Sequence, residues 1–213
     1  MLNRGVEKRP IVIDDGDRMR FVQSLYVFND ENHAPNGVSQ KRVRQQMSLA
    51  RSPFVYLHAW CLMDNHYHLL VSPVNDDLKN VSQFMKKLNM GYAKFFNEKY
   101  ERSGYLWQGR YKKVPITNHS QHIHIPHYIH LNPLDYIYPE WRKGRLVDSG
   151  SALEKLYEYR WSSFLDYMGN KNFPSLIYKN YLQSQLGDKK DHWKSLLNII
   201  QDDSFTEVEK NFE

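Results

Sequence analysis

The sequence has a single cysteine, no long apolar run and no apolar segment at its start. One cysteine, Cys61, excludes an intramolecular disulfide framework and a cysteine zinc cluster, and it is typical of a reducing compartment. No apolar stretch approaches the roughly 18 residues of a membrane helix, and the opening MLNRGVEKRP lacks the apolar centre of a signal peptide. We therefore expect a cytoplasmic protein with no membrane partner.

The composition is that of a folded chain. The 213 residues are 41% hydrophobic and 14% aromatic, which is enough to bury a sizeable core and argues against a mainly disordered protein. This length suits one domain with an extension, or two small domains.

Positive charge is concentrated in the middle of the chain. The whole sequence has 29 Lys and Arg against 24 Asp and Glu, a net charge of +5, but residues 36–115 alone have a net charge of +8. Aromatic side chains are threaded through the basic stretch from 84 to 113. Cations neutralise phosphates and rings stack on bases, so this segment is either a nucleic-acid surface or a solvated helix face over an aromatic core.

The first half of the chain reads as a helix, a loop and two strands. The DDGD turn precedes apolar residues at helical spacing, which predicts a helix over Arg18–Asn29 and then a loop over Asn29–Ser39. Val55–Met63 and His66–Val71 are rich in strand-forming residues and flank a tight turn, so they predict two neighbouring strands.

The second half is mainly helical. Residues 78–100 have the spacing of a long amphipathic helix, residues 114–116 predict a short strand, and a helix follows from about Ser120 to Asn132. Pro126 within this last helix means that the helix begins near the proline or kinks there. Short helices are expected over 152–156, 161–168, 178–186 and 192–200. The order predicts an α+β fold, an antiparallel sheet with helices packed on one face.

His66 and His68 are two residues apart on a predicted strand. A period of two puts both imidazoles on one face, while Tyr67, Leu69 and Val71 point to the other. Two neutral imidazoles on a rigid strand can bind one divalent cation, although an H-x-H pair is also compatible with two ordinary polar-face histidines.

Five segments in the same order resemble the single-tyrosine HUH transposases, in particular the REP-associated tyrosine transposases and their insertion-sequence relatives. They are LNRGVEKRPIVIDDGDRMRF, WCLMDNHYHLLVSP, GYLWQGRYKKVPI, HYIHLNPL and YRWSSFLDYMG. The resemblance covers about residues 2 to 170. It implies a ferredoxin-like or RRM-like HUH domain over residues 1–150 and a small helical C-terminal extension over 151–213, of which 171–213 matches no motif.

The resemblance also implies the chemistry. Tyr128 matches the nucleophilic tyrosine, and His66, His68 and Asn132 match the three metal ligands, for which Mg²⁺ or Mn²⁺ is the expected ion. The implied reaction is cleavage and strand transfer of single-stranded or hairpin DNA through a covalent 5′-phosphotyrosine. The protein is then a monomer or a homodimer.

Basic residues near these motifs are the expected DNA contacts. They are Arg4, Arg42, Arg44, Lys86, Lys87, Arg110, Lys112 and Lys113. The histidines at 119, 122, 124, 127 and 130 are either a second metal site, contacts to phosphates, or neighbours of Tyr128.

Three functions remain open from the sequence. The first is a metal-dependent DNA transposase that uses Tyr128. The second is a domesticated hairpin-DNA-binding protein without cleavage activity. The third is a histidine-metal hydrolase unrelated to nucleic acid.

Overall fold

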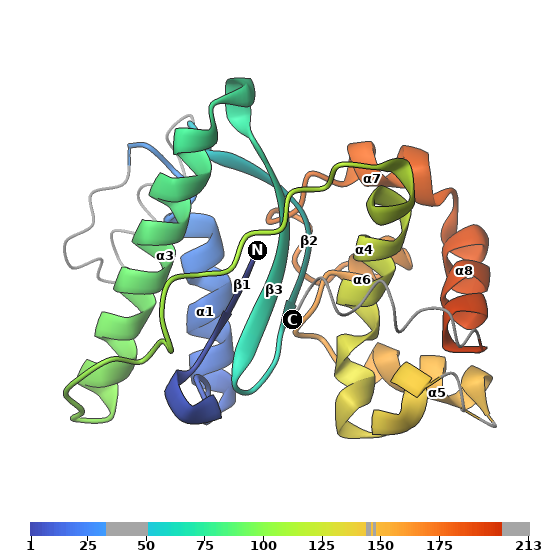
Figure 1. Cartoon of the computed structure of the whole chain (residues 1–213), viewed down its shortest axis with the longest axis horizontal. Helices are drawn as coiled ribbons and strands as arrows, with labels where there is room; N and C mark the ends of the chain where they lie inside the picture. Colours follow the sequence, from blue (N-terminus) through green and yellow to red (C-terminus); the bar gives the residue numbers. More distant parts are fainter. Residues whose placement is uncertain (33–50, 144–145, 147, 202–213) are drawn as a thin grey trace.

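A three-stranded antiparallel sheet lies at the centre of the molecule (Figure 1). The computed structural model describes residues 1–32, 51–143, 146 and 148–201. The strands are β1 (Leu2–Arg4), β2 (Val55–Leu62) and β3 (His66–Pro73), and their order in the sheet is β1-β3-β2. The predicted α+β class and antiparallel sheet are therefore confirmed, and so are the two neighbouring strands.

The register of β3 places the two histidines opposite named partners. His66 pairs with Arg4 of β1, while His68 lies between Leu2 of β1 and Cys61 of β2. A β-bulge between Leu57 and Ala59 shifts the alternation of side chains along β2. Its later residues therefore alternate between the two faces in step with β3.

Helices cover both faces of the sheet, so the prediction of helices on one face is wrong. One face packs against α1 (Asp15–Val27) and α3 (Leu78–Lys99), and the other against α4 (His119–Leu131) (Figure 1). The reason lies in β2, where Trp60 and Leu62 face the first layer while Ala59 and Cys61 face the second. A strand that is apolar on both sides must be buried on both.

Side chains cap the N-terminal ends of two helices that the sequence predicts, α1 and α4. Asp14 and Asp17 form a capping box at the start of α1, and Lys99 of α3 makes ion pairs with both carboxylates. Asn118 caps α4, whose first turn precedes Pro126 by several residues. Thus α4 does not begin near the proline but includes it.

The C-terminal helices complete the layer around α4. They are α5 (Ser149–Lys155), α6 (Phe164–Tyr167), α7 (Lys179–Leu186) and α8 (Lys189–Gln201). Short 3₁₀ turns lie at Val6–Lys8, Val74–Asp76, Asn132–Tyr136, Pro139–Lys143 and Leu156–Glu158. Leu153, Phe164 and Leu196 share one apolar core with Tyr128 and Cys61. The division at residue 150 remains a prediction.

The segment at 114–116 is not a strand, contrary to prediction. Val114 and Ile116 pack against the core on the α4 side, and the nearest pairing is an isolated bridge between Leu2 and Lys112. Pro115 lacks a backbone N–H, which disfavours further pairing with β1.

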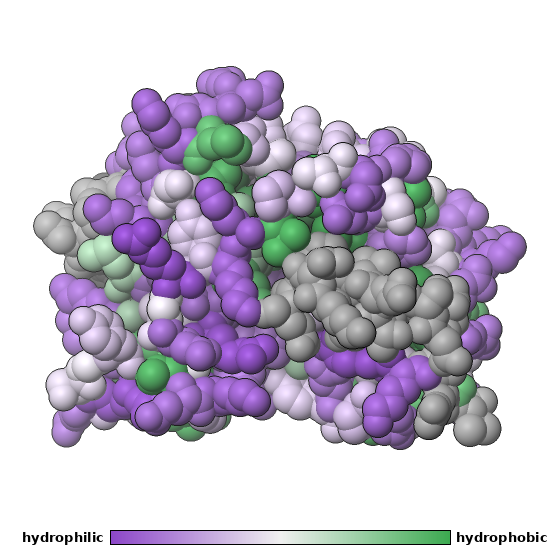
Figure 2. All heavy atoms as spheres, viewed as in Figure 1, coloured by the Kyte–Doolittle hydropathy of each residue, from purple (hydrophilic) through white to green (hydrophobic). Residues whose placement is uncertain are grey.

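Hydrophilic residues cover most of the face shown in Figure 2, with a smaller hydrophobic area near its centre. Within the described residues, no helix has the length and apolar character needed to cross a membrane.

Candidate active site

The imidazoles of His66 and His68 lie side by side on the face of β3 that looks toward α4. Their ring centroids are 5.0 Å apart and the rings are nearly perpendicular, while Tyr67 and Leu69 point into the opposite core, as predicted. Burial, with a smaller contribution from nearby Arg4, lowers the pKa of His66 to about 4. Burial also lowers the pKa of His68 well below its usual value, so both rings are neutral at pH 7.

Asn65 fixes which nitrogen of His66 is available. The Nδ1 atom of His66 lies 2.6 Å from Asn65 Oδ1, which can only accept a hydrogen bond. Nδ1 therefore carries the proton and Nε2 carries the lone pair, the form in which an imidazole binds a metal ion. The sequence interpretation did not assign a role to Asn65.

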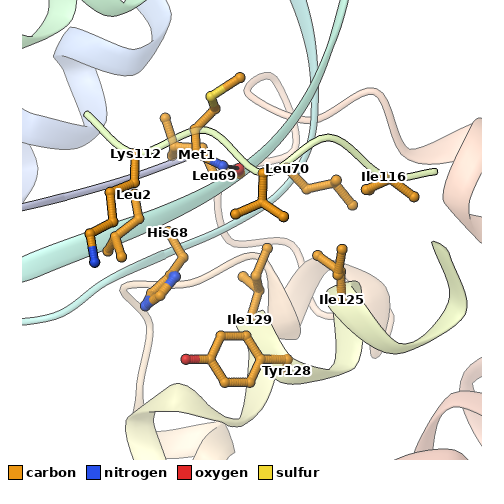
Figure 3. Close-up of a pocket in the computed structure, with 11 residues that line it drawn as sticks. Met1, Leu2, His68, Leu69, Leu70, Lys112, Ile116, Ile125, Tyr128 and Ile129 are labelled. Atoms are coloured by element: carbon orange, nitrogen blue, oxygen red, sulfur yellow. Dashed lines mark hydrogen bonds between the residues drawn. The ribbon is translucent and has the colours of Figure 1, made fainter. Parts of the chain in front are cut away.

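Tyr128 lies near the C-terminal end of α4, against the histidine pair. Its ring stands edge-on to His68 with centroids 5.4 Å apart, and the whole side chain is 2% exposed. Both residues line a small cavity of about 40 Å³, together with Leu2 and Lys112 (Figure 3). Two sequence-predicted site residues from distant parts of the chain therefore meet.

Asn132 follows α4 directly and is fully buried. Its Nδ2 donates to the backbone carbonyl of Tyr128 at 2.7 Å, so that the amide oxygen Oδ1 faces the other way. This oxygen accepts a hydrogen bond from Arg142 at 3.3 Å. A carbonyl oxygen has two lone pairs and can hold a second partner.

Arg142 and Asp135 are site residues that the sequence analysis missed. Arg142 Nη1 lies 3.4 Å from the hydroxyl oxygen of Tyr128, and Asp135 accepts from Arg142 Nε at 2.8 Å and from Nη2 at 2.6 Å. Both residues lie between the HYIHLNPL and YRWSSFLDYMG segments, outside the motifs that carry the resemblance. No residue spacing in that segment indicates their role. Two 3₁₀ turns bring the segment back to Tyr128, and the side chain of Trp141 in the second turn is buried.

Three of the predicted DNA contacts lie together beside β1. Arg4, Arg110 and Lys112 line a cavity of about 270 Å³ with Gln108 and Asn3. Lys112 and Leu2 also line the cavity of Tyr128 and His68, so the two cavities are neighbours. Position 5, next to Arg4, requires glycine, because a Cβ there would collide with the carbonyl oxygen of Arg9.

The remaining predicted DNA contacts are not part of this arrangement. Lys86 and Lys87 belong to α3, on the opposite side of the sheet, and Lys87 Nζ donates to the backbone carbonyl of Asp30 at 2.9 Å. Lys113 is exposed next to Lys112. Arg42 and Arg44 lie outside the described residues.

The histidines of α4 divide into two groups. His119 is exposed, and His122 and His124 are half-buried, whereas His127 and His130 are buried against His192 of α8. His130 is bonded to His192 at 3.0 Å and to Ser163 at 2.8 Å. In the part of the chain that the structure describes, no group of three or more His, Cys, Asp or Glu side chains is arranged to hold a metal ion. A second metal site of that kind is therefore not present among these residues.

The donor set of the first site fits a divalent ion. Two neutral imidazoles and the amide oxygen of Asn132 are three donors of the nitrogen and oxygen type that such ions accept.

A family model of IS200-like transposases matches residues 27–132. The chain belongs to the IS200-like transposase family. The matched segment contains His66, His68 and Tyr128 and ends at Asn132. Neither the curated proteins nor the solved structures contain a match to this transposase. Arg142 and Asp135 lie beyond the matched residues.

Proposed function

We propose that this transposase cleaves and rejoins single-stranded DNA through a covalent link to Tyr128. The observation that carries the proposal is the contact of the Tyr128 ring with His68, in a common cavity. A phenol is a weak nucleophile at neutral pH, so it needs accurate positioning next to groups that activate the phosphate. The buried contact supplies that positioning.

The reaction balances within the DNA and the protein. The Tyr128 oxygen forms a bond to phosphorus while the bond from phosphorus to the 3′ oxygen breaks. The products are a 5′-phosphotyrosine and a free 3′ hydroxyl, which takes up a proton equivalent to the one lost by the phenol. The phosphodiester energy is kept in the new link, so a 3′ hydroxyl of another strand can reverse the step without a nucleotide cofactor.

His66, His68 and Asn132 are the residues that would hold the Mg²⁺ or Mn²⁺ ion. A bound divalent ion would supply Lewis-acid polarisation of the phosphate. Asn65 orients His66, and the buried position of His68 keeps its imidazole neutral, which preserves the nitrogen lone pairs needed for binding.

The cavity beside β1 is the proposed place for the nucleotide next to the cleaved phosphate. Arg4, Arg110 and Lys112 offer three cations, and Gln108 offers an amide that can read a base edge. Because Lys112 borders both cavities, a strand that occupies the larger one would lie next to the cavity of Tyr128. A hairpin with a single-stranded flank has the required unpaired nucleotides.

A single subunit can form the site in this proposal. Tyr128 and both histidines of one chain are already adjacent, which supports a monomer, or a homodimer in which each subunit uses its own tyrosine. We place the reaction in the cytoplasm, the location that the sequence predicts.

The proposal is tested with labelled DNA hairpins whose flanking nucleotides are randomised. Incubation with Mg²⁺ or Mn²⁺ should give a protein–DNA adduct that survives a denaturing gel, and sequencing of the captured DNA identifies the target. Tyr128→Phe should abolish the adduct. Tyr157→Phe is the matched control, because Tyr157 packs against Phe164 and Trp193 of the C-terminal helices rather than against His68.

Other outcomes identify the alternative functions. Salt-sensitive hairpin binding without an adduct indicates a binding protein that has lost cleavage. No DNA affinity at moderate salt indicates a histidine-metal hydrolase. An equal adduct from Tyr128→Phe and the unmodified chain would rule out Tyr128 as the nucleophile.

A further inference from the structure

Arg142 brings a guanidinium group to the point where Tyr128 and Asn132 meet. Its Nη1 atom is 3.4 Å from the Tyr128 hydroxyl oxygen and its Nη2 atom is 3.3 Å from Asn132 Oδ1. The central guanidinium carbon lies 5.3 Å from the centre of the Tyr128 ring. The contacts are at the long end for hydrogen bonds, as is common in free enzymes whose contacts shorten when substrate binds.

Asp135 determines how the guanidinium is turned. Its carboxylate accepts from Nε and Nη2 of Arg142 in the two-bond arrangement that arginine and carboxylates favour. The Nη1 edge is therefore directed to Tyr128. Trp141 Nε1 donates to Asp135 Oδ1 at 2.7 Å, so the carboxylate is itself fixed by a buried indole.

The charges around Tyr128 favour an anion. Arg4 is the cross-strand partner of His66, and Arg142 contacts Tyr128, which packs against His68, so two cations lie close to the histidine pair. Asp135 offsets one of these charges, and the imidazoles themselves are neutral. These groups together leave one uncompensated positive charge, and a phosphate group that enters between Arg142 and the histidines would neutralise it.

We propose that Arg142 is a catalytic residue of strand cleavage, which orients the Tyr128 oxygen and binds a non-bridging oxygen of the attacked phosphate, and that Asp135 is its positioning residue. This inference rests on the proposed tyrosine reaction. As the Tyr128 oxygen bonds to phosphorus and the 3′ oxygen leaves with its electron pair, negative charge grows on the non-bridging oxygens. A fixed guanidinium stabilises that charge without reorganisation.

Lysine cannot replace arginine fully in this role. A guanidinium can donate to Tyr128, Asn132 and Asp135 in fixed directions, whereas an ammonium is a point charge on a flexible stem. Arg142→Lys should thus keep part of the charge effect and lose the orientation of Tyr128.

The experiment measures single-turnover adduct formation and, separately, hairpin binding in EDTA. We expect Arg142→Ala to slow adduct formation by about 100- to 1,000-fold, the usual cost of losing a donor that stabilises a developing anion, with less than about a fivefold change in DNA dissociation constant. Arg142→Lys should fall between Arg142→Ala and the unmodified chain. Added guanidinium or methylguanidinium should raise the Arg142→Ala rate at least tenfold, because only the side-chain group is missing.

Asp135→Asn tests the positioning role. We expect a loss of about 10- to 100-fold, comparable to the loss of a supporting residue in other sites, and no further loss when Asp135→Asn is added to Arg142→Ala. A merely structural role of Asp135 would give additive losses and a lower melting temperature in both backgrounds.

Arg160→Ala is the matched control, since Arg160 also stacks on aromatic rings, Trp161 and Phe173, but touches none of the site residues named above. It should keep the rate of the unmodified chain. The proposal is overturned if Arg142→Ala or Arg142→Lys reacts within threefold of the unmodified chain, or if a folded Arg142→Ala gains nothing from guanidinium. If the unmodified chain forms no adduct on any hairpin, the tyrosine reaction fails first and this inference fails with it.

Discussion

Asn65 shows how a neighbouring residue can fix the tautomer of a proposed metal ligand, His66. Its Oδ1 accepts from His66 Nδ1, and its Nδ2 donates to the backbone carbonyl of Lys8 at 3.2 Å. The second bond holds the amide in the orientation that the first requires. The His66 tautomer is therefore fixed by the turn between β2 and β3.

We expect Asn65→Ala to weaken metal binding at His66 and His68. Loss of a hydrogen bond that orients a ligand typically costs about 10- to 100-fold in metal affinity. Titration of Mn²⁺ followed by electron paramagnetic resonance measures this directly, and the Mn²⁺ concentration for half-maximal adduct formation should rise by a similar factor. Asn198→Ala, on the exposed face of α8, should change neither quantity. An unchanged Mn²⁺ affinity in Asn65→Ala would show that the tautomer is fixed in another way.

At the scale of elements, the sequence predicted α4 and β3 well, but it did not predict how the chain after α4 returns to them. The two-residue period of H-x-H and the helical run before Pro133 are local signals, and both elements form where expected. Arg142 reaches Tyr128 only because two 3₁₀ turns fold back over α4, and no local pattern encodes that path. The sequence analysis also did not predict that helices cover both faces of the sheet. The reason is present in β2, where the consecutive apolar residues Trp60 and Cys61 face opposite sides.

The junction of α4, α6 and α8 is built around buried neutral histidines. Burial lowers the pKa of His130 to about 3 and that of His127 to about 4, and it lowers the pKa of His192 well below its usual value. In the unfolded chain these groups take up protons near pH 6.5. Falling pH therefore favours the unfolded chain until the folded-state pKa values are reached.

We expect the free energy of unfolding to fall steeply between pH 6.5 and pH 4. At pH 5 each such histidine costs about 2 kcal/mol relative to pH 8, because the unfolded state binds a proton that the folded state excludes. Urea unfolding at pH 7.5 and pH 5 measures the difference. His130→Asn should reduce that difference by about 2 kcal/mol. His119→Asn, at an exposed position of the same helix, is the matched control. A full acid loss in His130→Asn would mean that other groups carry the effect.

For the whole molecule, the apolar core on the α4 side of the sheet joins the candidate site to the C-terminal helices. Tyr128 and Cys61 belong to the same buried cluster as Leu153, Phe164 and Leu196. His192 of α8 bonds to His130, two residues after Tyr128. The backbone of Trp60 is likewise bonded to Ser163. Tyr128 is thus held in place partly by residues that follow position 150.

We expect a chain that ends at residue 150 to lose the site. Removal of α5 to α8 exposes Leu131 of α4 and Leu134 of the 3₁₀ turn after it. Near-ultraviolet circular dichroism should therefore be lost while the dye ANS binds. A chain that ends at residue 201 is the control, because it keeps every contact described above, and it should melt cooperatively like the full chain. Cooperative melting of the 1–150 fragment near the melting temperature of the full chain would instead support an independent first domain. In that case the adduct assay on the fragment would show whether the site needs the C-terminal helices at all.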